Sequence, residues 1–140
     1  MNELSIMSQC FAQVRRVARC SPMYIEKFKD IPVDTMMTKD QFETLPFTTK
    51  QDLRDAYPMG MQCVPNGQIV RVHSSSGTTG VPVIIPYSSQ DIEDWAVMME
   101  RCYQFAGVTR EDRVQVTPGF GLWTAGLGFQ AGAQRLGAMV

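Results

Sequence analysis

The spacing of apolar residues predicts a helical first half of the chain. Apolar side chains recur three and four positions apart from Leu4 to Ala18, which is typical of one face of an amphipathic helix. Later helix starts are indicated by Pro22 and by Thr49, which has Asp52 three residues on. The helices expected here are Leu4 to Cys20, Pro22 to about Lys29, Lys39 to Thr44, and Lys50 to Ala56.

In the second half of the chain, short apolar runs alternate with stretches whose apolar residues recur at helical spacing. This order of strand, helix, strand and helix predicts an α/β fold with a mostly parallel sheet. We expect residues 1-68 to form a helical segment packing on the sheet, and 69-140 to form part of an α/β nucleotide-binding subdomain. Together they would make one domain, truncated at the C-terminal end. The expected elements are strands from Ile69 to His73, Val81 to Tyr87, Arg113 to Thr117 and from Ala138 onward, and helices Gln90 to Ala106 and Leu122 to Leu136.

The stretch Ser74-Ser75-Ser76-Gly77-Thr78-Thr79-Gly80 separates two of these apolar runs. Its residues carry only a hydroxyl or no side chain. Glycine lets backbone N–H groups approach a ligand, and hydroxyls add short donors, so a concave loop of this kind suits phosphate oxygens. It is not a Walker A motif, because Val81 follows Gly80 where that pattern needs lysine. By composition alone, a flexible surface loop is an equal alternative.

The order of these residues, S-S-S-G-T-T-G-x-P, resembles the phosphate-binding loop of adenylate-forming enzymes. That superfamily contains acyl-CoA synthetases, aryl-CoA ligases and luciferases. Segments 45–58 and 119–128 are similar to the corresponding flanks in phenylacetate-CoA ligases. The resemblance covers the chain from about Tyr24 to Val140 and corresponds to the N-terminal portion of such an enzyme.

The resemblance implies an ATP-dependent aryl- or arylacetate-CoA ligase. In that family a carboxylate attacks the α-phosphate of ATP, giving acyl-adenylate and pyrophosphate, and the thiol of CoA then displaces AMP. Mg²⁺ accompanies ATP, and Thr78 or Thr79 would lie nearest the metal. The residues implied to contact the ATP phosphates are Ser75, Ser76, Gly77, Thr78, Thr79 and Gly80.

The segment after the predicted strand at 113–117 resembles the acyl-pocket wall of the family. Phe120 and Trp123 could stack against an aromatic carboxylic acid, and Gly126 would leave room for its ring. Gly121 belongs to the same wall. The alternative is that these residues pack between a helix and the sheet.

Two departures from the family pattern concern catalysis. Many relatives have lysine before the proline of the loop, where this chain has Val81, so pyrophosphate handling should be weaker. The adenine-binding aromatic motif, the ribose-binding aspartate and the C-terminal lysine of the superfamily would all lie beyond Val140. No catalytic residue is therefore carried over. We expect the isolated chain to be inactive and to need a homo-oligomer or a missing C-terminal portion.

Composition and charge narrow the class of protein. A net charge of -1 gives no electrostatic case for nucleic acid or an anionic membrane. No apolar run approaches the ~20 residues that span a bilayer. Four scattered cysteines and a single histidine do not support a zinc site, so reduced thiols in the cytoplasm are expected. His73 is interpreted as a hydrogen-bonded residue that holds the loop, in preference to a general base.

Two other functions remain open at this point. A coenzyme F390 synthetase-type adenylyltransferase, which resembles the same family, would transfer AMP to a deazaflavin. A non-catalytic nucleotide-binding or assembly domain would complete its sheet by pairing at the unfinished strand near Val140.

Overall fold

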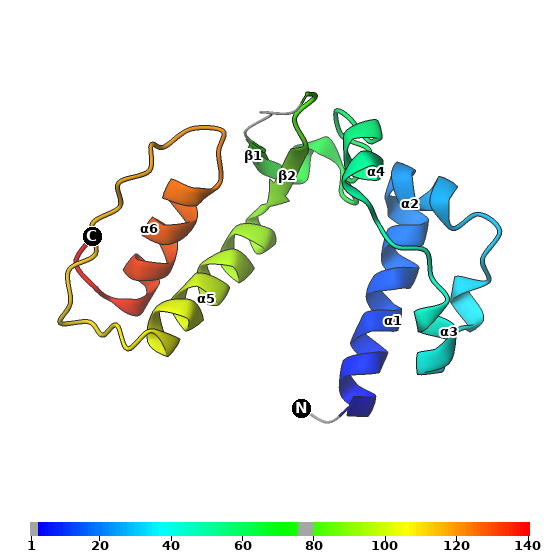
Figure 1. Ribbon diagram of the computed structural model, residues 1–140, viewed down its shortest axis with the longest axis horizontal. Coiled ribbons are helices and arrows are strands. Elements are labelled where there is room, and N and C mark those ends of the chain that lie inside the picture. Colours follow the sequence, from blue (N-terminus) through cyan, green and yellow to red (C-terminus); the bar gives the residue numbers. More distant parts are fainter. Residues whose placement is uncertain (1–2, 76–79) are drawn as a thin grey trace. The chain divides into compact units, whose positions relative to one another are not determined.

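The computed structural model describes residues 3–75 and 80–140. The chain forms two compact units, Met1–Pro65 and Asn66–Val140, which are drawn with their helices and strands in Figure 1. That residues 1-68 pack on the sheet stays a prediction. Within the described residues, no helix is long and apolar enough to cross a membrane.

The first unit is built from one 18-residue helix followed by shorter helices and turns. The helices expected from the sequence are confirmed, with ends that differ by one or two residues. Their bounds are α1 (Glu3–Cys20), α2 (Pro22–Lys27), the 3-10 turn η1 (Val33–Thr35), α3 (Lys39–Glu43) and α4 (Lys50–Asp55). Thr38 and Thr49 open α3 and α4 with reciprocal capping boxes, which satisfy backbone N–H groups that the first turn leaves unpaired.

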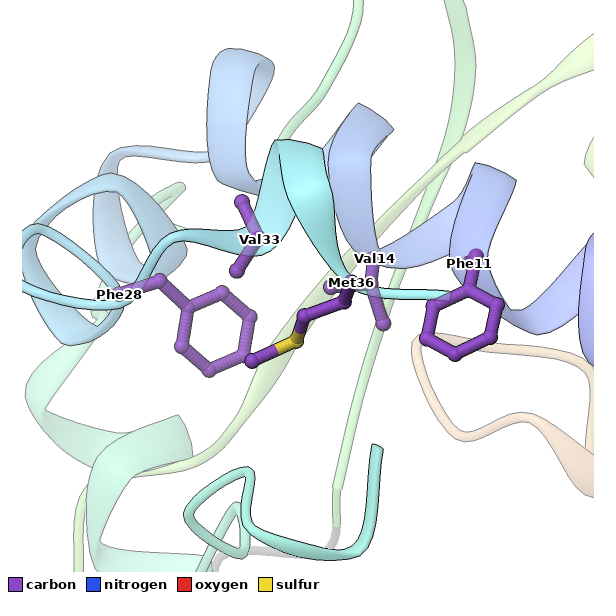
Figure 2. Close-up of a cluster of buried hydrophobic side chains, with 5 residues drawn as sticks. All are labelled: Phe11, Val14, Phe28, Val33 and Met36. Carbon is purple, nitrogen blue, oxygen red and sulfur yellow. The ribbon is translucent and has the colours of Figure 1, made fainter. Parts of the chain in front are cut away.

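A small apolar core holds the first unit together. Figure 2 shows Met36 extending towards the ring of Phe28, with Val14 and Phe11 beside it. These residues and Val33 are all buried. The ring of Phe11 also meets that of Phe42 edge to face, at 5.9 Å between centroids. The apolar face predicted for α1 is therefore the face that packs on the following segments.

The second unit places a β-hairpin before two helices. Its elements are the 3-10 turn η2 (Asn66–Gln68), β1 (Ile69–Ser74), β2 (Ile84–Ser88), α5 (Ser89–Phe105) and α6 (Ala125–Leu136). β1 and β2 pair antiparallel, with Ser74 opposite Ile84. The parallel pairing that the sequence predicted is represented among the described residues by one bridge, between Arg113 and Met139. The mixed α/β class that the sequence predicted is confirmed, because helices combine with a small two-stranded sheet.

Three predictions about the extent of strands and helices are wrong. β2 begins three residues later than Val81, because Pro82 has no N–H to donate. Arg113 to Thr117 is not a strand, because its pairing among the described residues is a single bridge of Arg113 with Met139, made by the bonds from Val114 N–H to Met139 O and from Met139 N–H to Asp112 O. α6 begins at Ala125, three residues after the predicted Leu122, whose carbonyl bonds outside the helix.

Glycines let α5 and α6 lie side by side (Figure 1). A Cβ at Gly128 would come within 2.3 Å of Cζ2 of Trp95, and one at Gly132 within 2.4 Å of Cβ of Met99. Both distances are too short for a side chain, so the helices approach at glycine. Arg135 of α6 adds a 2.8 Å bond to Glu100 of α5.

Candidate functional site

The Ser/Thr/Gly loop connects the two strands of the hairpin. Of its predicted phosphate-binding residues, Ser76, Gly77, Thr78 and Thr79 lie outside the described residues. Ser75 and Gly80 are described, and they stand at the two ends of the loop. That these six residues bind ATP phosphates stays a prediction, as does a place for Mg²⁺ beside Thr78 or Thr79.

The first end of the loop is tied to the strand that returns from it. The Ser75 N–H donates to the carbonyl of Val83 at 3.0 Å, and the Val83 N–H donates to Ser75 Oγ at 3.0 Å. At the other end Gly80 has a φ of 124°, a conformation that favours glycine. These contacts extend the hairpin by one residue pair, so the loop begins from a fixed base. The Ser75 hydroxyl still has its own proton to donate.

The predicted acyl-pocket segment lies against the base of the loop. The carbonyl of Leu122 accepts a 2.8 Å bond from Ser74 N–H and contacts Nδ1 of His73 at 2.9 Å. Leu122 stands between Gly121 and Trp123, two of the residues predicted for the acyl pocket. The structure therefore brings together two segments that are far apart in the sequence, since His73 and Leu122 are separated by 49 positions.

The four predicted pocket residues differ in their surroundings. Phe120 and Trp123 are 58% and 52% exposed, and Gly121 is also exposed. Gly126 is buried, and a Cβ there would come within 2.9 Å of the carbonyl oxygen of Gly119. The missing side chain at Gly126 thus makes room for backbone, whereas the sequence interpretation gave that room to a substrate ring. That these residues bind an acid stays a prediction.

His73 is buried within an aromatic cluster. It is 1% exposed, and its ring meets those of Tyr87 and Trp95 nearly at right angles, with 5.5 Å between centroids in both cases. Tyr87 and Trp95 stack on each other at 5.4 Å. The expectation of a hydrogen-bonded histidine is confirmed. Its partner, a backbone carbonyl 49 positions away, could not be found from the sequence, because any residue type supplies that atom.

Burial and a nearby charge both raise the pKa of the neighbouring Tyr87. Burial raises the pKa of the Tyr87 phenol above its ordinary value, and the nearby carboxylate of Asp91 raises it further. Asp91 is held in place by Ser88, whose N–H and hydroxyl both donate to it, at 2.8 and 2.7 Å. The cluster therefore carries a protonated phenol at neutral pH.

Metal-binding side chains do not gather in the described part of the chain. No group of three or more histidine, cysteine, aspartate or glutamate residues lies close enough there to hold an ion. The four cysteines, Cys10, Cys20, Cys63 and Cys102, form no disulfide in the described part of the chain. The oxygen donors of the loop suit a hard cation such as Mg²⁺ when phosphate supplies the other ligands.

Comparison with solved structures defines the class of protein to which this fold is similar. No family model matches the chain. Among solved structures, it superposes on an open conformation of 2-hydroxyisobutyryl-CoA ligase in complex with 2-HIB-AMP and CoA, with a TM-score of 0.84 and 28% identity over 96% of this chain and 32% of that one. A second structure of that ligase, in the thioesterification state, gives a TM-score of 0.83 over 99% of this chain and 31% of that one. The fold is therefore that of part of an adenylate-forming CoA ligase.

Sequence relatives make the similarity more specific. The chain is 46% identical over 121 residues to phenylacetate-coenzyme A ligase of Escherichia coli (strain K12), and 43% identical over 121 residues to that of Pseudomonas putida. Each match covers 85% of this chain. The chain spans about 28% of the length of these curated relatives. The resemblance recognised in the sequence is confirmed, because the chain is similar to a segment of phenylacetate-CoA ligases and to part of an adenylate-forming CoA ligase.

Proposed function

We propose that this chain supplies the phosphate-binding loop and one wall of the acyl pocket of an ATP-dependent aryl- or arylacetate-CoA ligase. The observation that carries the proposal is the double contact at Leu122. Ser74 and His73, directly before the loop, both bond to a carbonyl inside the predicted acyl segment. Carboxylate adenylation needs this adjacency, because the acid must meet the α-phosphate. The 46% identity to a phenylacetate-CoA ligase supports the aromatic substrate class.

In this proposal the chain acts by positioning. Hydroxyls and backbone N–H groups of residues 75–80 hold the β- and γ-phosphates and then the departing pyrophosphate, without a nucleophile of their own. Mg²⁺, where bound with ATP, supplies charge neutralisation on the phosphate oxygens. Phe120 and Trp123 present exposed aromatic surface against which an aryl ring can stack. CoA would enter in the second half-reaction.

The chain by itself does not complete this reaction in the proposal. The family's contacts to adenine and ribose and its catalytic lysine have no counterpart by motif in these 140 residues. Activity therefore requires the remainder of a ligase, on the same polypeptide or on a partner. A cytoplasmic location, with reduced thiols, fits four cysteines that form no disulfide among the described residues.

A chimaeric ligase tests the proposal. In it, this chain replaces the matching stretch of the E. coli phenylacetate-CoA ligase. We expect the chimaera to catalyse ATP–pyrophosphate exchange that depends on phenylacetate or a related aryl acid. Gly77→Trp should abolish the exchange by filling the loop. Gly67→Trp is the matched control, because Gly67 has open space around it, and it should retain the exchange.

The other outcomes favour other functions. A folded chimaera that shows no exchange with any aryl acid would overturn the proposal. Transfer of AMP to a deazaflavin would then favour the flavin-adenylylating alternative. Self-association of the chain without any nucleotide chemistry would favour the assembly domain.

A further inference from the structure

Two donors from consecutive residues converge on one acceptor in the second unit. The carbonyl oxygen of Leu122 receives the backbone N–H of Ser74 at 2.8 Å and lies 2.9 Å from Nδ1 of His73. A carbonyl oxygen has two lone pairs, and this arrangement uses both. Leu122 itself is exposed, with 62% of its surface accessible, so its side chain contributes little to holding the segment. The two hydrogen bonds to its backbone carbonyl hold the segment in place.

The contact fixes which ring nitrogen of His73 carries hydrogen. A carbonyl only accepts, so Nδ1 must be the donor. Nε2 is buried and has no partner among the described residues. The bond to Leu122 is thus the one polar anchor that this part of the chain gives the ring. Its orientation is otherwise set by packing against Tyr87 and Trp95.

The packing behind His73 reaches the helix that follows the acyl segment. Trp95 contacts His73 on one side, and on another its indole fills the space that a side chain at Gly128 of α6 would need. Near the start of the same helix, Gly126 lies against the backbone of Pro118 and Gly119. His73 therefore joins β1, α5 and the 118–124 segment at a single buried position.

We propose that His73 is a positioning residue, which as the Nδ1–H tautomer sets the placement of the acyl-pocket segment relative to the base of the phosphate loop. This inference rests on the proposed function. An acid that attacks the α-phosphate must be placed to within a fraction of an ångström, so an error in the placement of the wall lowers the rate even when both ligands bind. Phosphate contacts by the loop itself do not depend on the histidine.

The chain offers a direct test, because His73 is its single histidine. Nitrogen-15 spectra of the 140-residue protein should show one imidazole, protonated at Nδ1 and unprotonated at Nε2. His73→Asn places an amide N–H where Nδ1 stands, whereas His73→Gln places it nearer Nε2. The carbonyl carbon-13 shift of Leu122 and the exchange rate of the Ser74 amide should stay near the parent's in His73→Asn. In His73→Gln the Leu122 carbon should shift, and the Ser74 amide should exchange about five- to tenfold faster, as expected for the loss of one hydrogen bond.

A control separates positioning from general loss of stability. Ala133→Gly removes a methyl group from a fully buried site in α6, away from the ring contacts of His73. It should destabilise the unit without moving the Leu122 carbonyl signal. A proton on Nε2 and none on Nδ1 would overturn the inference. So would equal spectra for His73→Asn and His73→Gln at Leu122 and Ser74.

The chimaeric ligase adds a kinetic readout. His73→Gln should lower kcat for exchange about tenfold or more and raise KM for the acid, with KM for ATP changed less than twofold. His73→Asn should restore most of the rate. Equal kinetics for both variants would count against the inference. A parent chimaera that lacks exchange would overturn the proposed function, and the spectra would then decide the role of His73 alone.

Discussion

Val81 is the residue at which the loop departs most from the chemistry proposed for it. It follows Gly80 directly and is 52% exposed. An apolar side chain at the mouth of a phosphate loop contributes no charge to the triphosphate. The lysine that the resemblance implies for this position would add a mobile cation there. In the proposed function, phosphate binding by the loop therefore depends on hydroxyl and backbone donors alone.

Replacing that residue tests how far those donors suffice. We expect Val81→Lys in the chimaeric ligase to lower KM for pyrophosphate and ATP about three- to tenfold, which is the effect of one charge-assisted contact at an exposed site. Val81→Met, which has similar length and no charge, is the control and should leave both values near the parent's. Equal effects of lysine and methionine would show that packing, and not charge, governs the position.

Asp52 ties two helices of the first unit through one carboxylate. Its Oδ2 accepts from Lys27 Nζ at 2.9 Å and from the N–H and hydroxyl of Thr49 at 2.6 and 2.8 Å. The bond from Lys27, followed by those from Thr49, lowers the pKa of Asp52 to about 2 from its ordinary 3.8. The folded state thus favours the ionised form more than the unfolded state does.

The sign of the pH dependence follows from that difference. The stabilisation is fully present above pH 3.8 and is lost as pH falls through about 2. We therefore expect Asp52→Asn to unfold at a lower temperature than the parent at pH 5, with the difference shrinking as pH falls to 2. Circular dichroism melting curves at both pH values measure this. Asp30→Asn, at an exposed carboxylate of the same unit, serves as control. A difference that grew towards low pH would contradict the assignment.

At the scale of elements, the packing of α5 against α6 stabilises the second unit. Two glycines of α6, Gly128 and Gly132, face Trp95 and Met99 with no room for a Cβ. Arg135 then bonds Glu100 and Glu93 from one guanidinium. The exposed ion pairs contribute little, since their attraction is screened by water. Close helix packing is the larger effect.

A side chain at Gly128 should consequently be costly. Gly128→Val would force the indole of Trp95 away and with it the ring contact to His73. We expect a loss of about 2–4 kcal/mol in the free energy of unfolding, the range for overpacking combined with a β-branched residue in a helix. Urea denaturation followed by tryptophan fluorescence measures it. Gly67→Ala, with nothing within 4 Å, should change stability by less than about 0.5 kcal/mol.

The elements show which parts of this fold a sequence can predict. The starts of α4 and α5 could be expected because their signals are local: a Thr or Ser cap and an Asp three residues on. The predicted start of α6 and the predicted strand from Arg113 to Thr117 were wrong, because both features depend on backbone partners far along the chain. The loop could be recognised from the order of its residues, whereas its attachment to Leu122 could not.

At the scale of the whole molecule, the proposed reaction needs more contacts than this chain provides. The chain spans about 28% of the length of the ligases it resembles. In the proposal it holds ATP through phosphates alone, so a nucleotide bound here lacks the contacts that orient adenine and ribose. A phosphate loop without those contacts should bind MgATP weakly and leave the α-phosphate unaligned with the acid. We expect the isolated chain to show no acid-dependent ATP–pyrophosphate exchange, and the chimaeric ligase to show it under the same conditions. Exchange by the isolated, pure chain would mean that its own residues align both substrates, and the need for a further portion would then be disproved.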